Sequence, residues 1–244
     1  MKPRPADHGF SLLELAISLA VAAVFLAILL PALSTARVST HRARCAGNQR
    51  LLGEAWTHCL EDGGGAFPMI AVQPGWRYGG VRFSSVDTAP FLDFARPLNR
   101  YLPVDRLDVP PVEIFSCPAD RGITDEYGEV GTGRRTAYRS FGTSYRANSL
   151  LFDARLAGLD SVPRGVRLSE ITTPASRLVV LGDPAWYEAL AKTGRMASWH
   201  GKTHAGNILF LDGSVRYMAL EPRPKVGPAV VEPVLTSAAV GNDD

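Results

Sequence analysis

The sequence predicts an α+β fold, in which one long N-terminal helix packs on a mostly antiparallel β-sheet domain. Three observations predict it: an uncharged apolar run at residues 15–33, a helix-compatible stretch at 34–62, and short β-rich runs between turns from residue 66 onward. The 244 residues suit one ordinary domain plus the helix. With 23 Gly and 18 Pro, the composition favours a loop-rich β domain over a helical bundle.

The apolar run from Leu15 to Leu33 has the length of a membrane-spanning helix. Its 19 residues carry no charge, and at about 1.5 Å per residue they cover ~28 Å, close to the hydrocarbon core of a bilayer. Eleven of them are Leu, Ile, Val or Phe, which together favour insertion by roughly 4 kcal/mol. We therefore expect a transmembrane helix over residues 10–33.

Glu14 stands at the start of this apolar stretch. An ionised carboxylate at the membrane edge is costly and usually has a partner. No Lys or Arg follows Glu14 within the next 22 residues. The nearest cation would be a new amino terminus, which a cut after Gly9 would create.

The segment GFSLLEL, residues 9–15, resembles the cleavage and methylation site of type IV pilins and type II secretion pseudopilins. The match lies at Gly9, Phe10 and Glu14. The resemblance implies that prepilin peptidase removes the basic leader, residues 1–9, on the cytoplasmic side and that the new Phe10 amine is methylated. It further implies that Glu14 pairs with the amine of a neighbouring subunit. The expected protein is a pilin-like structural subunit of a pilus or a type II secretion pseudopilus, with other subunits as its partners.

Two other interpretations of the apolar stretch stay open. One is a plain membrane anchor, and the other is a signal peptide cleaved after Ala36, although the run exceeds the usual core of about 7–15 residues. The positive-inside rule does not favour an exterior C-terminus, because basic residues lie on both sides of the run. These are Lys2 and Arg4 before it and Arg37, Arg42 and Arg44 after it. The resemblance therefore decides the orientation: a single pass through the inner membrane, with the C-terminal domain outside the cytoplasm.

The helix is expected to continue over residues 34–62. A kink is predicted at Pro31, since proline removes a backbone hydrogen bond and clashes with the preceding turn. Spacings of three and four give the second half one apolar face. Its members are Leu51, Leu52, Ala55, Trp56, Cys59 and Leu60. The three glycines at 63–65 end the helix.

Residues 63–220 are expected to form the globular β-rich domain. The segments VRFSSV (81–86) and SRLVVLGD (176–183) are predicted strands. NILFLDGSVRYMAL (207–220) predicts a hairpin, because Asp-Gly at its centre favours a type I′ turn. The proline-punctuated residues 221–244 are expected to be an irregular tail.

A second resemblance covers most of the chain. It is to pilin-like proteins whose globular domain ends in a processing-associated motif, in which His is followed by nine residues and then Asp-Gly. The matching stretches are Cys45–Gly53, Arg96–Leu102, Phe115–Asp120, Ser144–Asn148, Leu168–Pro174 and Asn207–Val215. The residues of the motif itself would be His200, His204, Asn207, Asp212 and Gly213. The spacing departs from that family: eleven residues separate His200 from Asp212, seven separate His204 from it, and Lys202 occupies the family's position.

The two histidines have the spacing of zinc ligands on one helical face. Two glycines in the segment WHGKTHAG disfavour a helix, and no Glu follows His200, so the zinc-hydrolase pattern is absent. We expect His200 and His204 on a surface loop and no cofactor. The alternative left open is a metal site with Asp212 or Asp183.

Three cysteines, Cys45, Cys59 and Cys117, permit at most one intramolecular disulfide. On one helix Cys45 and Cys59 would lie ~21 Å apart and could not bridge each other. The alternatives are a disulfide from Cys117 to one of them, or three reduced thiols. Nothing close in sequence activates Cys117 as a nucleophile, so we expect a structural role for it.

Several other features point to no specific chemistry. The acidic segment formed by Asp120, Asp125, Glu126 and Glu129 lacks the spacing of a calcium loop and is expected to be solvated. Trp56, Trp76, Trp186 and Trp199 are expected in the core or at its rim. A net charge of +2, from 26 basic and 24 acidic residues, gives no indication of nucleic acid as a partner.

The sequence thus predicts a structural subunit rather than an enzyme. The competing hypothesis is a membrane-anchored binding or metal-dependent domain that uses the pilin export route. Such a domain would need polar groups that converge in a pocket near His200, His204 and Asp212.

Overall fold

The structure is a computed structural model that describes residues 11–72, 74–81, 96–102, 113–122, 136–187, 199–201 and 205–219. The chain divides into two compact units, residues 1–40 and 41–244. Some expected features lie outside the described residues: the leader with its cleavage site, the 81–86 strand beyond its first residue, and the 221–244 tail.

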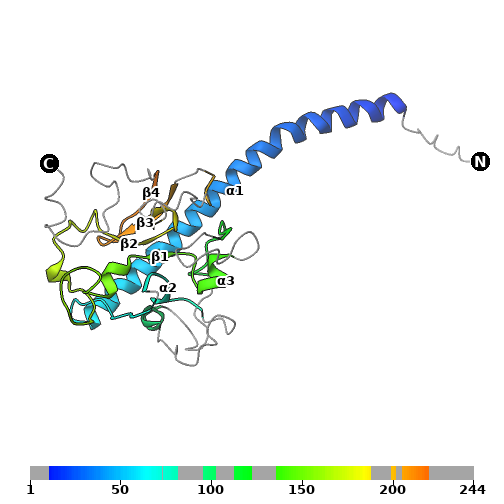
Figure 1. The fold of residues 1–244 in the computed structure, drawn as a ribbon. Coiled ribbons are helices and arrows are strands. Elements are labelled where there is room, and N and C mark those ends of the chain that lie inside the picture. The colour runs from blue at the N-terminus through cyan, green and yellow to red at the C-terminus, as the bar shows by residue number, and fades with distance from the viewer. Residues whose placement is uncertain are drawn as a thin grey trace, which may run out of the picture. The chain divides into compact units, whose positions relative to one another are not determined.

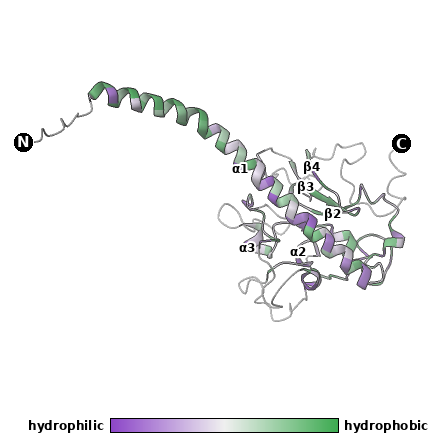
Figure 2. Cartoon of the chain, turned by 180° about the vertical axis from the view of Figure 1, so that it is seen from behind, coloured by the Kyte–Doolittle hydropathy of each residue, from purple (hydrophilic) through white to green (hydrophobic). Residues whose placement is uncertain are grey.

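The described part of the first unit is the N-terminal half of helix α1 (Leu12–Asp62). All residues from Ser11 to Thr40 are exposed, and Figure 2 shows most of this half as apolar. The helix is long and apolar enough to cross a membrane, as the sequence predicted. It continues through Pro31, whose carbonyl oxygen accepts hydrogen bonds from the hydroxyls of Ser34 (2.8 Å) and Thr35 (3.1 Å). The kink itself stays a prediction.

The C-terminal half of α1 buries the side chains of one face in the core of the second unit. The buried residues are Cys45, Gln49, Leu52, Ala55, Trp56, Cys59 and Leu60. Leu51, expected on this face, is instead 40% exposed, because one residue along a helix turns the side chain by about 100°. The predicted stop is confirmed: Gly63 N donates to Cys59 O, Gly65 N donates to Leu60 O, and Gly65 has a φ of +78°.

Four antiparallel strands form one sheet in the order β1-β2-β3-β4. They are β1 (Arg146–Ala147), β2 (Val179–Gly182), β3 (Ala205–Phe210) and β4 (Val215–Ala219). Strand β2 and the β3–β4 hairpin lie where the sequence predicted them. The long helix packed on an antiparallel sheet is therefore a pilin-like α+β fold.

The hairpin turn differs from the expected two-residue type I′ turn. Gly213 N donates to Phe210 O (3.0 Å), and Phe210 N donates to Ser214 O (2.9 Å). The loop therefore has three residues, 211–213, with Gly213 in the left-handed region at a φ of +79°. Such three-residue loops place their glycine at this position and match the twist of the strands as well.

Short helices complete the second unit. They are α2 (Pro74–Arg77), α3 (Ala137–Phe141), and the 3-10 turns Pro97–Tyr101, Ser149–Phe152 and Leu168–Glu170. Figure 1 shows β2, β3 and β4 on one side of the C-terminal half of α1, and α2 and α3 on the other. A Cβ added at Gly53 would lie 3.0 Å from Leu209 of β3, so this glycine permits the close approach of helix and sheet.

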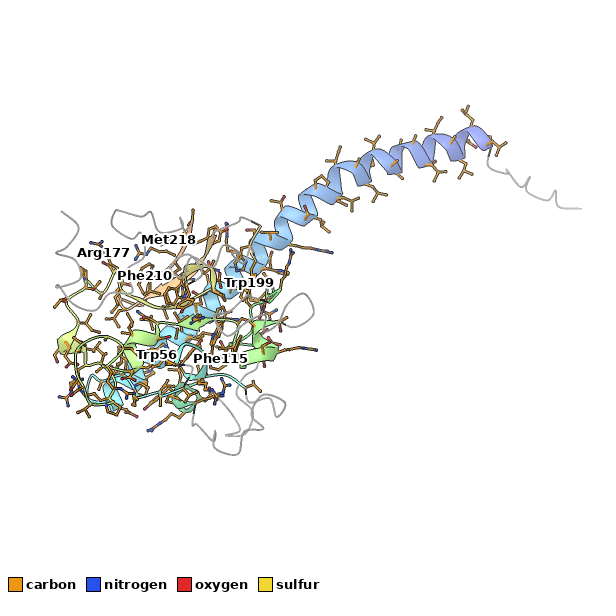
Figure 3. The ribbon with its side chains drawn as sticks, viewed as in Figure 1. Trp56, Phe115, Arg177, Trp199, Phe210 and Met218 are labelled. Atoms are coloured by element: carbon orange, nitrogen blue, oxygen red, sulfur yellow. A yellow bond between two sulfur atoms is a disulfide. The ribbon has the colours of Figure 1, made fainter. Side chains whose placement is uncertain are left out.

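Trp56 of α1 is at the centre of the core. Its ring lies 5.5 Å from that of Phe67 and 5.4 Å from that of Phe152, in tilted geometries. Figure 3 shows Trp56 and Phe115 among the packed side chains of this unit. All four tryptophans are buried, as expected: Trp56, Trp76, Trp186 and Trp199.

Candidate functional site

Glu14 is the one predicted assembly residue that the structure describes at the start of α1. Its carboxylate Oε2 accepts a hydrogen bond from Ser11 N (2.9 Å), while Ser11 Oγ accepts one from Glu14 N (3.2 Å). This reciprocal pair is a capping box, which satisfies backbone donors that the first turn leaves unpaired. Within the described ranges, Oε1 of Glu14 accepts no hydrogen bond.

The capping box was missed in the sequence, although its signature, Ser followed three residues later by Glu, is present at Ser11–Glu14. Charge alone indicates no partner for Glu14 in its own chain, whereas the capping box supplies one. The cleavage and methylation residues, Gly9 and Phe10, lie outside the described residues.

A second cluster of chemically capable side chains is buried between α1 and the sheet. A disulfide joins Cys45 of α1 to Cys117, with the Cα atoms 5.3 Å apart. Cys59 is free and buried. Burial raises the pKa of the Cys59 thiol, an effect that a hydrogen bond from Tyr101 opposes, so Cys59 is a packing residue rather than a reactive one.

His200 lies against this disulfide. Its Nε2 is 3.7 Å from Cys117 Sγ and 3.0 Å from Asp183 Oδ2, and its side chain is fully buried. The expectation of a surface loop is therefore wrong for His200, because the chain folds its imidazole inward onto a buried carboxylate. His204 lies outside the described residues.

Asp183 connects this cluster to the helix and the sheet. Besides His200, its carboxylate accepts hydrogen bonds from Gln49 Nε2 (3.1 Å) and from Asn207 N (2.7 Å). Asn207 in turn donates through Nδ2 to the carbonyl oxygen of Arg42 in α1 (3.2 Å). A buried charge needs several such partners, and here they come from α1, β3 and the segment before β3.

Two buried polar atoms in the cluster have no hydrogen-bond partner within the part of the chain that the structure describes. They are His200 Nδ1 and Gln49 Oε1. Because an unpaired buried polar atom costs free energy, each such atom requires an explanation.

The other members of the expected motif lie apart from this cluster. Asp212 sits in the hairpin turn, where its Oδ1 accepts hydrogen bonds from Ser214 N (2.9 Å) and Ser214 Oγ (2.6 Å). Gly213 supplies the left-handed residue of the same turn. Among the described residues, the side chains that could share a metal ion with His200 are Cys45 and Cys117 and not Asp212.

Asp120, expected in a solvated acidic loop, instead connects several backbone segments through its carboxylate. Its carboxylate accepts hydrogen bonds from the backbone N–H groups of Gly122, Ala137 and Tyr138, each at 2.9 Å, and from Ser144 Oγ (2.6 Å). These bonds hold the start of α3 beside the segment 113–122, called the Cys117 loop below. The other acidic residues of that segment, Asp125, Glu126 and Glu129, lie outside the described residues.

The comparisons with known proteins bear on the N-terminal segment. Residues 4–30 match the prokaryotic N-terminal methylation motif, which is the prepilin-type motif and covers most of the leader, Glu14 and most of the apolar run. No curated protein and no solved structure matches the chain. The motif indicates processing by prepilin peptidase and a membrane-anchored chain whose globular domain lies outside the cytoplasm.

Proposed function

We propose that this chain is a structural pilin or pseudopilin subunit, which prepilin peptidase cleaves after Gly9 and which assembles into a pilus or a type II secretion pseudopilus. The observation that carries the proposal is the methylation motif on a helix whose apolar side chains are exposed on every face. From Leu12 to Leu33 this helix finds no covering residue among those described. A helix that is apolar all round is stable only in lipid or against other apolar helices.

Assembly in this proposal moves the apolar half of α1 from the inner membrane into the core of a filament. Head-to-tail contacts that do not close on themselves produce helical fibres. The folded unit from His41 onward then forms the outside of the fibre.

The capping geometry supports different roles for the two carboxylate oxygens of Glu14. Oε2 accepts a hydrogen bond from Ser11 N in its own chain. Oε1, which accepts no hydrogen bond from the described residues, is free to accept one from the methylated Phe10 amine of a neighbouring subunit. One carboxylate then both starts the helix and fixes the register between subunits.

We assign no catalytic activity to the chain. Cys117 is held in a disulfide and, like His200 and Asp183, it is buried, so no substrate reaches these groups from solvent. The competing function, a membrane-anchored binding or metal-dependent domain at His200, His204 and Asp212, draws no support from the position of Asp212.

The first test is the mass of the mature N-terminal peptide from native membranes. The expected peptide starts at Phe10 and carries one additional methyl group. The matched control is the same chain expressed without prepilin peptidase, which should keep its leader. An intact leader in the presence of the peptidase would exclude processing as a pilin.

The second test separates the charge of Glu14 from its capping role. Glu14→Gln keeps an acceptor for Ser11 N but removes the charge, whereas Glu14→Ala removes both. We expect both variants to insert and to be cleaved, and both to be absent from sheared filaments. Ser11→Ala is the control, since it removes the bond to Glu14 N but leaves the carboxylate. Normal incorporation of Glu14→Gln would show that capping, and not pairing with an amine, is what assembly requires.

A further inference from the structure

The two sulfur atoms of the disulfide lie close to the imidazole of His200. Cys45 Sγ, Cys117 Sγ and a ring nitrogen of His200 all lie within 4.8 Å of one another, and each of the three residues is at most 2% exposed. They come from α1, from the loop before α3 and from the segment before β3. Thiolate and imidazole are the ligands that structural zinc sites use.

One of the distances around His200 is close to the ligand spacing of a tetrahedral zinc ion. With bonds of about 2.3 Å to sulfur and about 2.0 Å to nitrogen, neighbouring ligand atoms in such a site lie roughly 3.5 Å apart. Cys117 Sγ is 3.7 Å and Asp183 Oδ2 is 3.0 Å from His200 Nε2. The sulfur of Cys117 is therefore close to the spacing of a zinc site, whereas Asp183 is at hydrogen-bond distance from the imidazole.

We propose that, when Cys45 and Cys117 are reduced, their thiolates and Nε2 of His200 bind one Zn²⁺ ion, with Asp183 as the fourth ligand. The two sulfur atoms would move apart to roughly 3.8 Å. Asp183 lies outside the mutual 4.8 Å distance of the other three, so a shift of its carboxylate toward the sulfur atoms is part of the proposal.

The chemistry balances without a redox change of the metal. A dithiol reductant converts the disulfide to two thiols and is itself oxidised to a cyclic disulfide. Zn²⁺ then displaces one proton from each thiol, and the proton on His200 moves from Nε2 to Nδ1, so two protons are released. A newly translocated chain has not yet formed its disulfide, so it needs no reductant.

The zinc ion and the disulfide would be alternative links between the same elements. Each joins the C-terminal half of α1 to the Cys117 loop, and neither can form while the other is present. Zinc would also protect the two thiols from oxidation, because the electron pairs that attack an oxidant are held by the metal.

The test is zinc binding by the full chain in detergent micelles, reduced with a dithiol and then freed of it without oxygen. We expect one zinc per chain by elemental analysis and, after loading with Co²⁺, the thiolate-to-cobalt charge-transfer absorption and the visible bands of a tetrahedral site. The oxidised chain should bind neither ion. Cys59→Ser is the matched control, because it removes the cysteine outside the cluster and should bind like the unchanged chain.

Two further variants make the result specific to this cluster. Cys45→Ser should lose at least half of the charge-transfer absorption, because only the Cys117 thiolate is left, and His200→Gln should bind zinc at least about tenfold more weakly. His200→Gln keeps both cysteines, so circular dichroism of its oxidised form shows whether it folds. The proposal is overturned if the reduced chain binds less than one zinc, if it stays unfolded when Zn²⁺ is added, if Cys59→Ser abolishes binding, or if folded His200→Gln binds unchanged.

Discussion

The two halves of helix α1 have the same backbone structure and opposite surroundings. Phe25 in the N-terminal half is 69% exposed, while Leu52 in the C-terminal half is 0% exposed. The first half is apolar on all faces, so no single direction can bury it within its own chain. The second half repeats buried residues at spacings of four and three, which keeps one face toward a core.

The contrast shows that the pattern of apolar side chains, rather than helix propensity, determines the surroundings of each half. A stripe assigns the second half to the core of its own domain. An apolar surface without a stripe assigns the first half to lipid or to other copies of the same helix. Figure 3 shows the side chains of the first turns projecting from the helix on all sides. A substitution in one half can therefore be controlled by a matched substitution in the other.

The largest expected effect follows from removing a core side chain of the C-terminal half. Trp56→Ala should lower the free energy of unfolding by about 3–5 kcal/mol, because it leaves a cavity among Phe67, Tyr78 and Phe152. Leu29→Ala, at an exposed position of the other half, should leave it unchanged. Urea unfolding of the full chain in detergent micelles, followed by near-ultraviolet circular dichroism, measures both. A loss below about 1 kcal/mol for Trp56→Ala would contradict the assigned core.

An introduced positive charge should affect membrane insertion in the N-terminal half of α1 and not in the C-terminal half. Leu26→Arg places a cation near the middle of the apolar run, which costs about 3 kcal/mol and removes most of the roughly 4 kcal/mol that favours insertion. The remaining ~1 kcal/mol corresponds to an inserted-to-free ratio of about 5, so we expect the membrane-inserted fraction to fall to roughly 80%, measured by alkaline extraction of membranes. Leu51→Arg, at a partly exposed position of the C-terminal half, is the control and should insert normally. Equal insertion of both variants would argue against a membrane-spanning role for the first half.

Local pattern was enough to predict much of the fold. The helix, its end at the three glycines, strand β2 and the β3–β4 hairpin all follow from periodicity and turn residues within about 15 neighbouring positions. The errors in these elements are of one residue: Leu51 lies beside the buried stripe, and the hairpin loop has three residues instead of two.

The buried cluster could not be predicted in this way. Cys45, Cys117, Asp183 and His200 are far apart in the sequence, and no periodicity connects them. His200 was expected in solvent because glycines surround it, whereas its burial depends on Asp183. One signal was overlooked: Gln49 is a polar residue on the apolar stripe, between Cys45 and Leu52, and such a residue indicates a buried polar partner.

Lowering the pH should give the smallest effect, a modest loss of stability in the folded unit. The apolar run has no charge from Leu15 to Leu33 that could titrate. In the folded unit, Arg164 donates to both oxygens of Glu170 (2.8 and 2.6 Å), and Arg167 N donates to one of them (2.8 Å). The side-chain bonds from Arg164, with the backbone bond from Arg167, lower the pKa of Glu170 from 4.5 to about 2.

A carboxyl whose pKa is lower in the folded state than in the unfolded state stabilises the fold above its unfolded pKa. That contribution is therefore complete above about pH 4.5 and is lost as the pH falls toward about 2. Because both side chains are partly exposed, solvent screening keeps the effect modest. We expect Glu170→Gln to melt below the unchanged chain at pH 6, and the two melting temperatures to converge near pH 2. A difference that stays constant from pH 6 to pH 2 would mean that the ion pair does not contribute.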